Sequence, residues 1–154
     1  MIANPACGTL RGKPAAASRM TTPECRNTRL EAVASLMIDE AVRLHRALGP
    51  GLLESVYETA LSDALRRRGL QVDRQRGISI RYRGSTFENA FRADLVVEGI
   101  IILEIKSIER VTPTHRKQLI TYLRLSGLHL GFLLNFGSAL MKDGIVRVVD
   151  RLPE

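Results

Sequence analysis

The order of apolar patterns along the chain predicts an α/β fold with a mixed central sheet flanked by helices. Two helical patterns come first, three strand patterns follow, and a helix and two strands complete the order. The run Ile100-Ile101-Ile102-Leu103 is apolar without alternation, which is typical of a central strand buried on both faces. The helical pattern between Thr112 and Gly127 joins this strand to the apolar run at 130–136, and it predicts a crossover between parallel neighbours.

The two N-terminal helices are predicted from apolar residues that recur at steps of three and four. The second stripe runs from Leu53 to Leu65, and Gly69 is its predicted C-cap. The first stripe begins after Thr28 and ends before Gly49-Pro50-Gly51; it consists of Leu30, Val33, Met37, Ala41, Leu44 and Leu48.

Five strands are predicted from alternation or from short apolar runs that turn residues interrupt. The alternating segment 78–82 is followed by a turn at Gly84-Ser85, and the segment 91–97 by a turn at Glu98-Gly99. The other strands are expected at 100–106, at 130–136 and, after the turn Lys142-Asp143-Gly144, at 145–149.

Residues 1–27 differ in composition from the rest of the chain. They show no period and are expected to form a disordered basic tail before a single domain at 28–151, with Met20 as a second candidate start. No run approaches the ~18 apolar residues of a membrane span, and no secretory signal precedes the domain, so a cytoplasmic protein without membrane contact is expected. Cys7 and Cys25 lie in this segment, and their spacing excludes a Cys-rich zinc site.

The charge balance favours a polyanionic partner, above all nucleic acid. The formal net charge is +7 at pH 7, and the isoelectric point is about 10.1. The tail alone contributes +3 of this charge, so the domain is only mildly basic.

Three charged residues interrupt the strands that are expected to be most buried. Glu104 and Lys106 lie two apart on the apolar strand and therefore point to the same face, and Asp94 lies on the strand before it. A hairpin centred on Gly99 would place Asp94 opposite Glu104, with their Cβ atoms about 5 Å apart. A two-residue turn at Glu98-Gly99 would instead put the two carboxylates on opposite faces, so the site requires the odd-length register.

Two adjacent carboxylates repel each other unless a proton or a cation lies between them. Hard oxygen ligands of this kind select Mg²⁺ or Mn²⁺, which can polarise a phosphoryl oxygen and generate hydroxide from water. Lys106 on the same face could orient that water or stabilise the charge developing on the phosphate. The alternative is a structural salt bridge between Lys106 and either acid, and the spacing alone leaves both open.

The order of these residues resembles the signature of the PD-(D/E)XK nuclease superfamily. Asp94 followed by Glu104-Ile105-Lys106 matches that signature, with Ala93 in place of the proline before the acid. The segment Gly51-Leu52-Leu53-Glu54-Ser55-Val56-Tyr57 is similar to the motif that names the GxxExxY family. The likeness runs from about Leu36 to about Val149 and includes the segments 42–51, 92–95, 118–123 and 133–137.

The resemblance implies an α-β-β-β-α-β core and assigns roles to further residues. Glu54 would complete the metal site from its helix, although a glutamate in a first turn also stabilises the helix dipole. Glu40 is a weaker substitute, and the Ile105 carbonyl would be a further ligand by analogy. Gln118 would contact the substrate phosphate or the attacking water, or would only close one end of the site as a polar residue.

Arg81, Arg83 and Arg92 are candidates for nucleic-acid contacts, with a solvated strand face as the alternative. Tyr57 and Tyr122 are expected to be core aromatics with one polar handle. A homodimer would suit an enzyme that cuts both strands of a duplex.

These observations together predict a Mg²⁺-dependent nuclease that acts on DNA or RNA. A non-catalytic module that binds nucleic acid or protein and retains the nuclease fold is the first alternative. A structural α/β subunit, in which Asp94 and Lys106 are merely paired, is the second.

Overall fold

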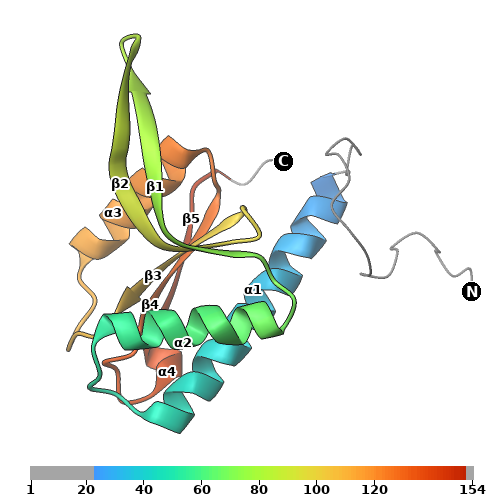
Figure 1. Ribbon diagram of the computed structural model, residues 1–154, viewed down its shortest axis with the longest axis vertical. Helices are drawn as coiled ribbons and strands as arrows, with labels where there is room; N and C mark the ends of the chain where they lie inside the picture. The colour runs from blue at the N-terminus through green and yellow to red at the C-terminus, as the bar shows by residue number, and fades with distance from the viewer. Residues whose placement is uncertain (1–22, 152–154) are drawn as a thin grey trace, which may run out of the picture.

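One mixed sheet forms the centre of the protein, and helices cover both of its faces (Figure 1). The computed structural model describes residues 23–151. The strands follow one another across the sheet in the order β1-β2-β3-β4-β5; β3 and β4 are parallel and the other neighbours are antiparallel. The elements are α1 (Pro23–Leu48), α2 (Glu54–Arg67), β1 (Val72–Tyr82), β2 (Ser85–Val97), β3 (Ile101–Lys106), α3 (Pro113–Ser126), β4 (Leu130–Asn135), α4 (Met141–Gly144) and β5 (Ile145–Val149).

The predicted crossover is confirmed, because α3 joins the parallel strands β3 and β4. Thr112 and His115 form a capping box at its start, and Gly127 ends it in the left-handed conformation at φ 72°. Among the described residues, no helix is long and apolar enough to cross a membrane.

Several boundaries differ from those predicted. The first strand begins at Val72 rather than at residue 78, because the charged stretch 73–76 hides the alternation on which the prediction depends. Its turn is Arg83-Gly84, one residue earlier than predicted, since Tyr82 pairs with Ser85. The turn predicted at 142–144 is the short helix α4.

The predicted tail at 1–27 is only partly covered by the described residues. Helix α1 begins at Pro23, so residues 23–27 are helical and the predicted boundary at 27/28 is too late. The rest of the predicted tail, residues 1–22, lies outside the described residues.

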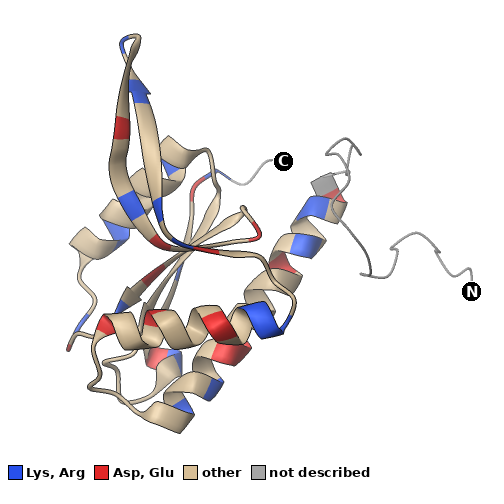
Figure 2. Cartoon of the chain, in the orientation of Figure 1, with Lys and Arg blue, Asp and Glu red and all other residues tan. Residues whose placement is uncertain are grey.

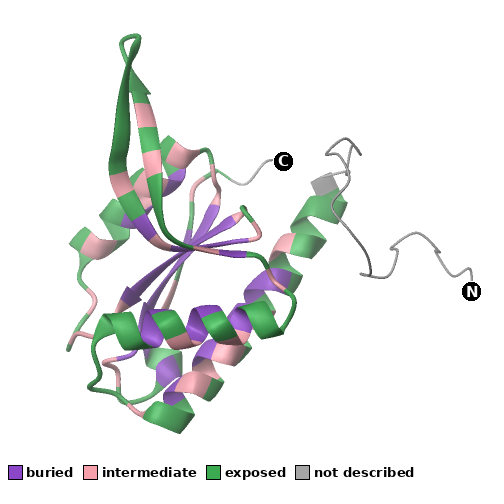
Figure 3. Cartoon of the chain, viewed as in Figure 1, coloured by how far each residue is buried: buried purple, intermediate pink, exposed green. Residues whose placement is uncertain are grey.

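The central strands are buried (Figure 3), and the two faces of the sheet have separate apolar cores. Helices α1 and α2 cover one face, where Tyr57 stacks on Phe136 with ring centroids 4.4 Å apart. The Tyr57 hydroxyl donates to the Gly49 carbonyl at 2.5 Å, so this residue is the core aromatic with a polar handle that the sequence predicts. Helix α3 covers the other face through Leu119 and Leu123.

The hairpin of β1 and β2 extends well beyond the body of the protein (Figure 1). We call residues 76–92 the arm. The ten residues from Arg81 to Ala90 are all exposed, so no other described element covers the distal part of the arm. Pairing between β2 and β3 covers only residues 95–97 of β2, and from Asp94 backwards β2 pairs with β1 alone.

The loop that follows β3 is fastened to the end of β4 by one buried side chain. The Asn135 Oδ1 atom accepts from the Ile108 amide at 3.0 Å and from the Gly137 amide at 3.1 Å. Its Nδ2 atom donates to the Ile108 carbonyl at 2.9 Å and to the Ser138 hydroxyl at 3.3 Å. Gly137 is required here, because an added Cβ would lie 2.3 Å from the Ile108 carbonyl oxygen. This contact fixes the chain two residues beyond Lys106.

Asn135→Ala is expected to lower the free energy of unfolding by about 2–3 kcal/mol, because the amide and carbonyl of Ile108 would lose their partner. Urea denaturation measures this change. Ser138→Ala is the control, since it removes only the longest of the four bonds and should cost less than about 1 kcal/mol. Equal losses in the two variants would show that Asn135 does not fasten the loop.

Candidate active site

The register of the β2–β3 hairpin brings Asp94 and Glu104 together. The pairs Leu95↔Leu103, Val96↔Ile102 and Val97↔Ile101 surround a loop of three residues, 98–100, in which Glu98 and Gly99 both have positive φ. Continued by one step, this register sets residue 94 opposite residue 104. The predicted odd-length register is therefore confirmed, and the two-residue turn is not formed.

Asp94 lies where β2 leaves β3, and its side chain takes over a backbone hydrogen bond of the sheet. The Oδ2 atom of Asp94 accepts from the Ile105 amide at 2.8 Å. Two observations show that β2 turns over at this point. Ala93 belongs to the α3 core whereas Leu95 belongs to the α1–α2 core, although regular alternation would put both on one face. Opposite them on β1, Gln75 has φ 49° in the left-handed region, which costs a non-glycine residue about 1 kcal/mol.

Glu104 is buried without compensation. Its exposed fraction is 7%, and its Oε1 atom has no hydrogen-bond partner among residues 23–151. Burial, and after it the negative charge of Asp94, raises the pKa of Glu104 from its ordinary 4.5 to about 8. Burial also raises the pKa of Asp94, against the lowering effect of the Ile105 amide and of Lys106. In the absence of a cation, the pair therefore holds a proton near neutral pH.

Lys106 is near both acids without being bound to either. Its positive charge lowers the pKa of Asp94 and of Glu104, yet its ammonium group forms no ion pair or hydrogen bond with any residue that the structure describes. The structural alternative, a salt bridge between Lys106 and one acid, is therefore not observed at this site.

Helix α3 closes the other side of the acidic pair. Gln118 donates from its Nε2 atom to the Tyr122 hydroxyl at 2.7 Å. Burial raises the pKa of Tyr122, and the charges of Glu104 and Asp94 raise it further, which places the tyrosine within electrostatic reach of both carboxylates. Its ring stacks on Phe91 at the base of the arm, 3.9 Å between centroids. Tyr122 is thus half-buried between the site and the arm.

Two glutamates of α2 approach the site in different ways. Glu54 is exposed, and its Oε1 atom accepts from the Ser107 amide, next to Lys106, at 3.3 Å. Glu58, one turn later, is buried and accepts from Arg74 at 3.1 Å and from Gln75 at 2.7 Å. The same Gln75 amide lies 3.4 Å from Oδ1 of Asp94.

Sequence reasoning missed Glu58. Its position four residues after Glu54, on the same face of α2, was the available signal. Glu40, the weaker substitute, has other partners: its Oε1 atom lies 3.3 Å from Arg43 and 3.6 Å from Arg68. The Glu40 carboxylate therefore forms ion pairs with arginines of α1 and of the end of α2.

The donor set fits a hard divalent cation held by two protein carboxylates. In residues 23–151, no group of three Asp, Glu, His or Cys side chains is close enough together to enclose an ion. The pair of Asp94 and Glu104 nevertheless offers oxygen ligands only, and the buried Oε1 atom of Glu104 still lacks a partner. A cation would supply that partner and offset the repulsion between the two acids.

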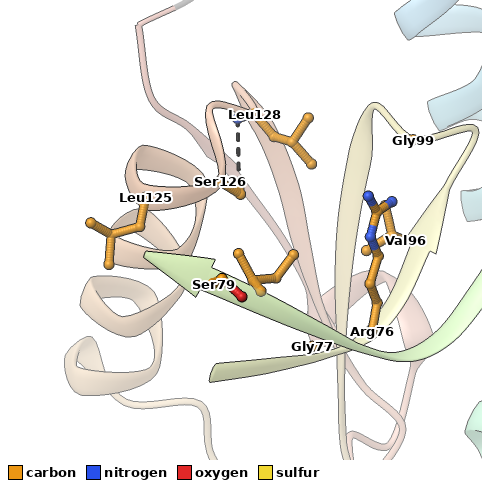
Figure 4. Close-up of a pocket in the computed structure, with 9 residues that line it drawn as sticks. Arg76, Gly77, Ser79, Val96, Gly99, Leu125, Ser126 and Leu128 are labelled. Carbon is orange, nitrogen blue, oxygen red and sulfur yellow. Dashed lines mark hydrogen bonds between the residues drawn. The ribbon is translucent and has the colours of Figure 1, made fainter. Parts of the chain in front are cut away.

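The predicted nucleic-acid contacts lie on the arm, and a pocket beside the arm is not lined by the acidic pair. Arg81, Arg83 and Arg92 are exposed along the arm. A pocket of about 320 Å³ opens between β1, the 98–100 loop and the end of α3 (Figure 4), and its lining includes none of the acidic residues of the site. It is lined by Arg76, Gly77, Ile78, Ser79, Val96, Gly99, Leu125, Ser126 and Leu128.

The mixed sheet and its α3 crossover form a nuclease-like fold of the PD-(D/E)XK type. Two carboxylates and a lysine lie where β2 and β3 separate in this fold. The chain belongs to the PD-(D/E)XK nuclease superfamily, whose family model matches residues 31–148. This membership indicates a nuclease-type function, for which nucleic acid is the substrate and divalent metal ions are typical. The narrower GxxExxY assignment stays a prediction. No curated protein and no solved structure matches the chain.

Glu104→Gln is expected to stabilise the metal-free protein at alkaline pH. Because folding raises the pKa of Glu104 from 4.5 to about 8, the cost of ionising this residue is absent below pH 4.5 and complete above pH 8. This pKa change corresponds to about 5 kcal/mol, so the variant should gain roughly 10–20 °C in thermal midpoint at pH 9 in EDTA and little at pH 5. Glu109→Gln, at an exposed position, is the control. A gain that does not depend on pH would contradict the assignment.

Proposed function

We propose that this protein is a Mg²⁺- or Mn²⁺-dependent nuclease that hydrolyses phosphodiester bonds at the pair of Asp94 and Glu104. The observation that carries the proposal is the unpartnered, buried Oε1 atom of Glu104 beside a second carboxylate. Burying like charges is costly unless a cation compensates them, and a hydrophobic sheet has no structural use for such a pair.

Asp94 and Glu104 would hold the cation, and Glu54 would assist from the start of α2. When bound, a divalent cation supplies a Lewis acid that polarises a phosphoryl oxygen and acidifies a water molecule. Asp94 is already oriented by the Ile105 amide, so its carboxylate needs no rearrangement. Glu54 is the α2 acid best able to turn toward a ligand, because one bond of 3.3 Å holds it, whereas Glu58 is fixed by Arg74 and Gln75.

Lys106 would act on the substrate. Its ammonium group has no partner in the part of the chain that the structure describes and lies on the face of β3 that carries Glu104, so it can donate to the phosphate or orient the attacking water. Gln118 would contact the phosphate or the water from α3. Its Nε2 atom donates to Tyr122, which leaves its carbonyl oxygen to accept from a water molecule.

Lys106→Ala is expected to reduce metal-dependent cleavage by about 10²–10³-fold, because it removes a donor to the developing charge. The assay uses purified protein with mixed DNA and RNA substrates in Mg²⁺, Mn²⁺ or EDTA. Lys142→Ala, at an exposed position of α4, is the matched control and should retain full activity. If the folded parent protein cuts nothing in any metal, the proposal fails and a non-catalytic binding module becomes the better assignment.

The two glutamates of α2 are expected to respond differently to amidation. Glu54→Gln should weaken Mg²⁺ binding about tenfold at an almost unchanged thermal midpoint, because it removes a metal-facing charge from the surface. Glu58→Gln should chiefly lower the thermal midpoint, since Arg74 would lose its ion pair. Titration calorimetry with Mg²⁺ and thermal melts measure both effects. A larger loss of Mg²⁺ affinity in the Glu58 variant would assign metal binding to Glu58 and a structural role to Glu54.

A further inference from the structure

The arm is a two-stranded ribbon whose distal end is not covered by any other element of residues 23–151 (Figure 1). Four residue steps separate Ile78, which pairs with Phe91 at the contact with α3, from Tyr82, which corresponds to about 13 Å of free length. Tyr82 and Phe87 are 60% and 50% exposed. An isolated hairpin of this kind is only marginally stable in water, so its extension is not explained by the stability of the fold.

The arm and α3 carry the excess basic charge of the described chain (Figure 2). The arm has four arginines against one acid, Glu88. Arg81, Arg83 and Arg92 form no ion pair with any described residue, whereas most other arginines of the domain have an acidic partner. Segment 106–126 adds five basic residues against Glu109. Positive charge therefore lies on the two elements next to the acidic pair, and only Arg76 and Arg124 among these basic residues form an ion pair with a described residue.

The tip of the arm contains a residue that is unfavourable for its own turn. Arg83 and Gly84 have φ values of 48° and 82°, which is the pattern of a type I′ turn. Asn or Asp followed by Gly is the preferred sequence there, and an arginine in this conformation costs about 1 kcal/mol. The Arg83 guanidinium lies 5.3 Å from the ring centroid of Tyr82, in the position of a cation–π contact. Strain of this kind is typical of functional positions.

We infer that the arm enters the major groove of duplex DNA and holds it against the acidic pair. This inference rests on the proposed nuclease function. A major groove about 12 Å wide and 8.5 Å deep admits a two-stranded β-ribbon, and the free length of the arm exceeds that depth. The deep, narrow major groove of duplex RNA does not admit one. Arg81 and Arg83 supply contacts to phosphates or base edges, and the Phe91–Tyr122 stack anchors the base of the arm beside the site.

The test uses the full chain and a variant designed to leave the hairpin folded. Arg83→Asn gives the turn its preferred residue, and Arg81→Thr pairs across the strands with Thr86. Arg46→Ala with Arg67→Ala is the control, because it removes the same charge from exposed positions on α1 and α2 that form no ion pair. Fluorescence anisotropy in EDTA measures affinity for duplex DNA, single-stranded DNA and duplex RNA of one sequence across a salt series.

The parent protein is expected to bind duplex DNA more tightly than either other nucleic acid. The arm variant should lose about tenfold to a hundredfold of that affinity, with a salt slope shallower by about 2, at an unchanged or higher thermal midpoint. It should keep its affinity for single strands, and the control should match the parent. Equal binding of duplex DNA by parent and arm variant would overturn the inference. So would an equal loss in the control, or a parent that binds duplex RNA as tightly.

Two further measurements separate the inference from the function on which it rests. Metal-dependent cleavage of single-stranded DNA should survive in the arm variant and disappear in Lys106→Ala. If Lys106→Ala is inactive while the arm variant binds and cuts duplex DNA normally, the nuclease stands and the arm assignment falls. The exposed Tyr82 and Phe87 could instead contact a second copy of the chain. Sedimentation velocity detects such a dimer. An arm variant with altered mass and unaltered DNA binding would also overturn the inference.

Discussion

The hydrogen bond from the Ile105 amide to Asp94 is the interaction on which the site depends. At this point β2 parts from β3, and a backbone donor of β3 would otherwise lose its partner next to a buried core. The Asp94 carboxylate accepts the hydrogen bond that a backbone carbonyl of β2 would otherwise accept. The separation of the two strands therefore also fixes the position of this acid. The same separation releases the β1–β2 hairpin from the sheet, so the arm and the acidic site share a common origin.

The fold then places a second acid where solvation is poorest. Glu104 lies on a strand whose other residues, from Ile101 to Ile105, are fully buried, and its neighbour across the hairpin is the oriented Asp94. A protein under selection for stability alone would place an apolar residue here, since a lone buried charge costs several kcal/mol. Lys106 relieves only part of this cost, because its charge lowers the pKa of both acids but it forms an ion pair with neither. The uncompensated part of this cost is what the cation in our proposal would offset.

The sequence predicted the register that pairs Asp94 with Glu104. It missed the role of Glu58 and the start of β1, each for a different physical reason. The apolar run at 100–103 and the single glycine at 99 sufficed for the register of Asp94 and Glu104, because hydrophobic burial and turn geometry are local signals. The role of Glu58 depends on Gln75, whose left-handed backbone has no sequence signature. The start of β1 was missed because charged residues occupy its exposed positions on both faces. Twist, long-range contacts and strain are tertiary properties that a pattern of residues does not display.

The distribution of charge also follows from the separation of the two strands. The acids that would hold a cation lie at the branch point, while three arginines without an ion pair among the described residues lie on the arm and further basic residues lie along α3. A polyanion that approaches this surface meets the positive potential of the basic residues first. It reaches the acidic pair only after these residues contact its phosphate backbone. Such an order suits a reaction in which a phosphate must approach two carboxylates. The basic surroundings lower the electrostatic cost of that approach, and the acidic pair remains available to the cation that we propose.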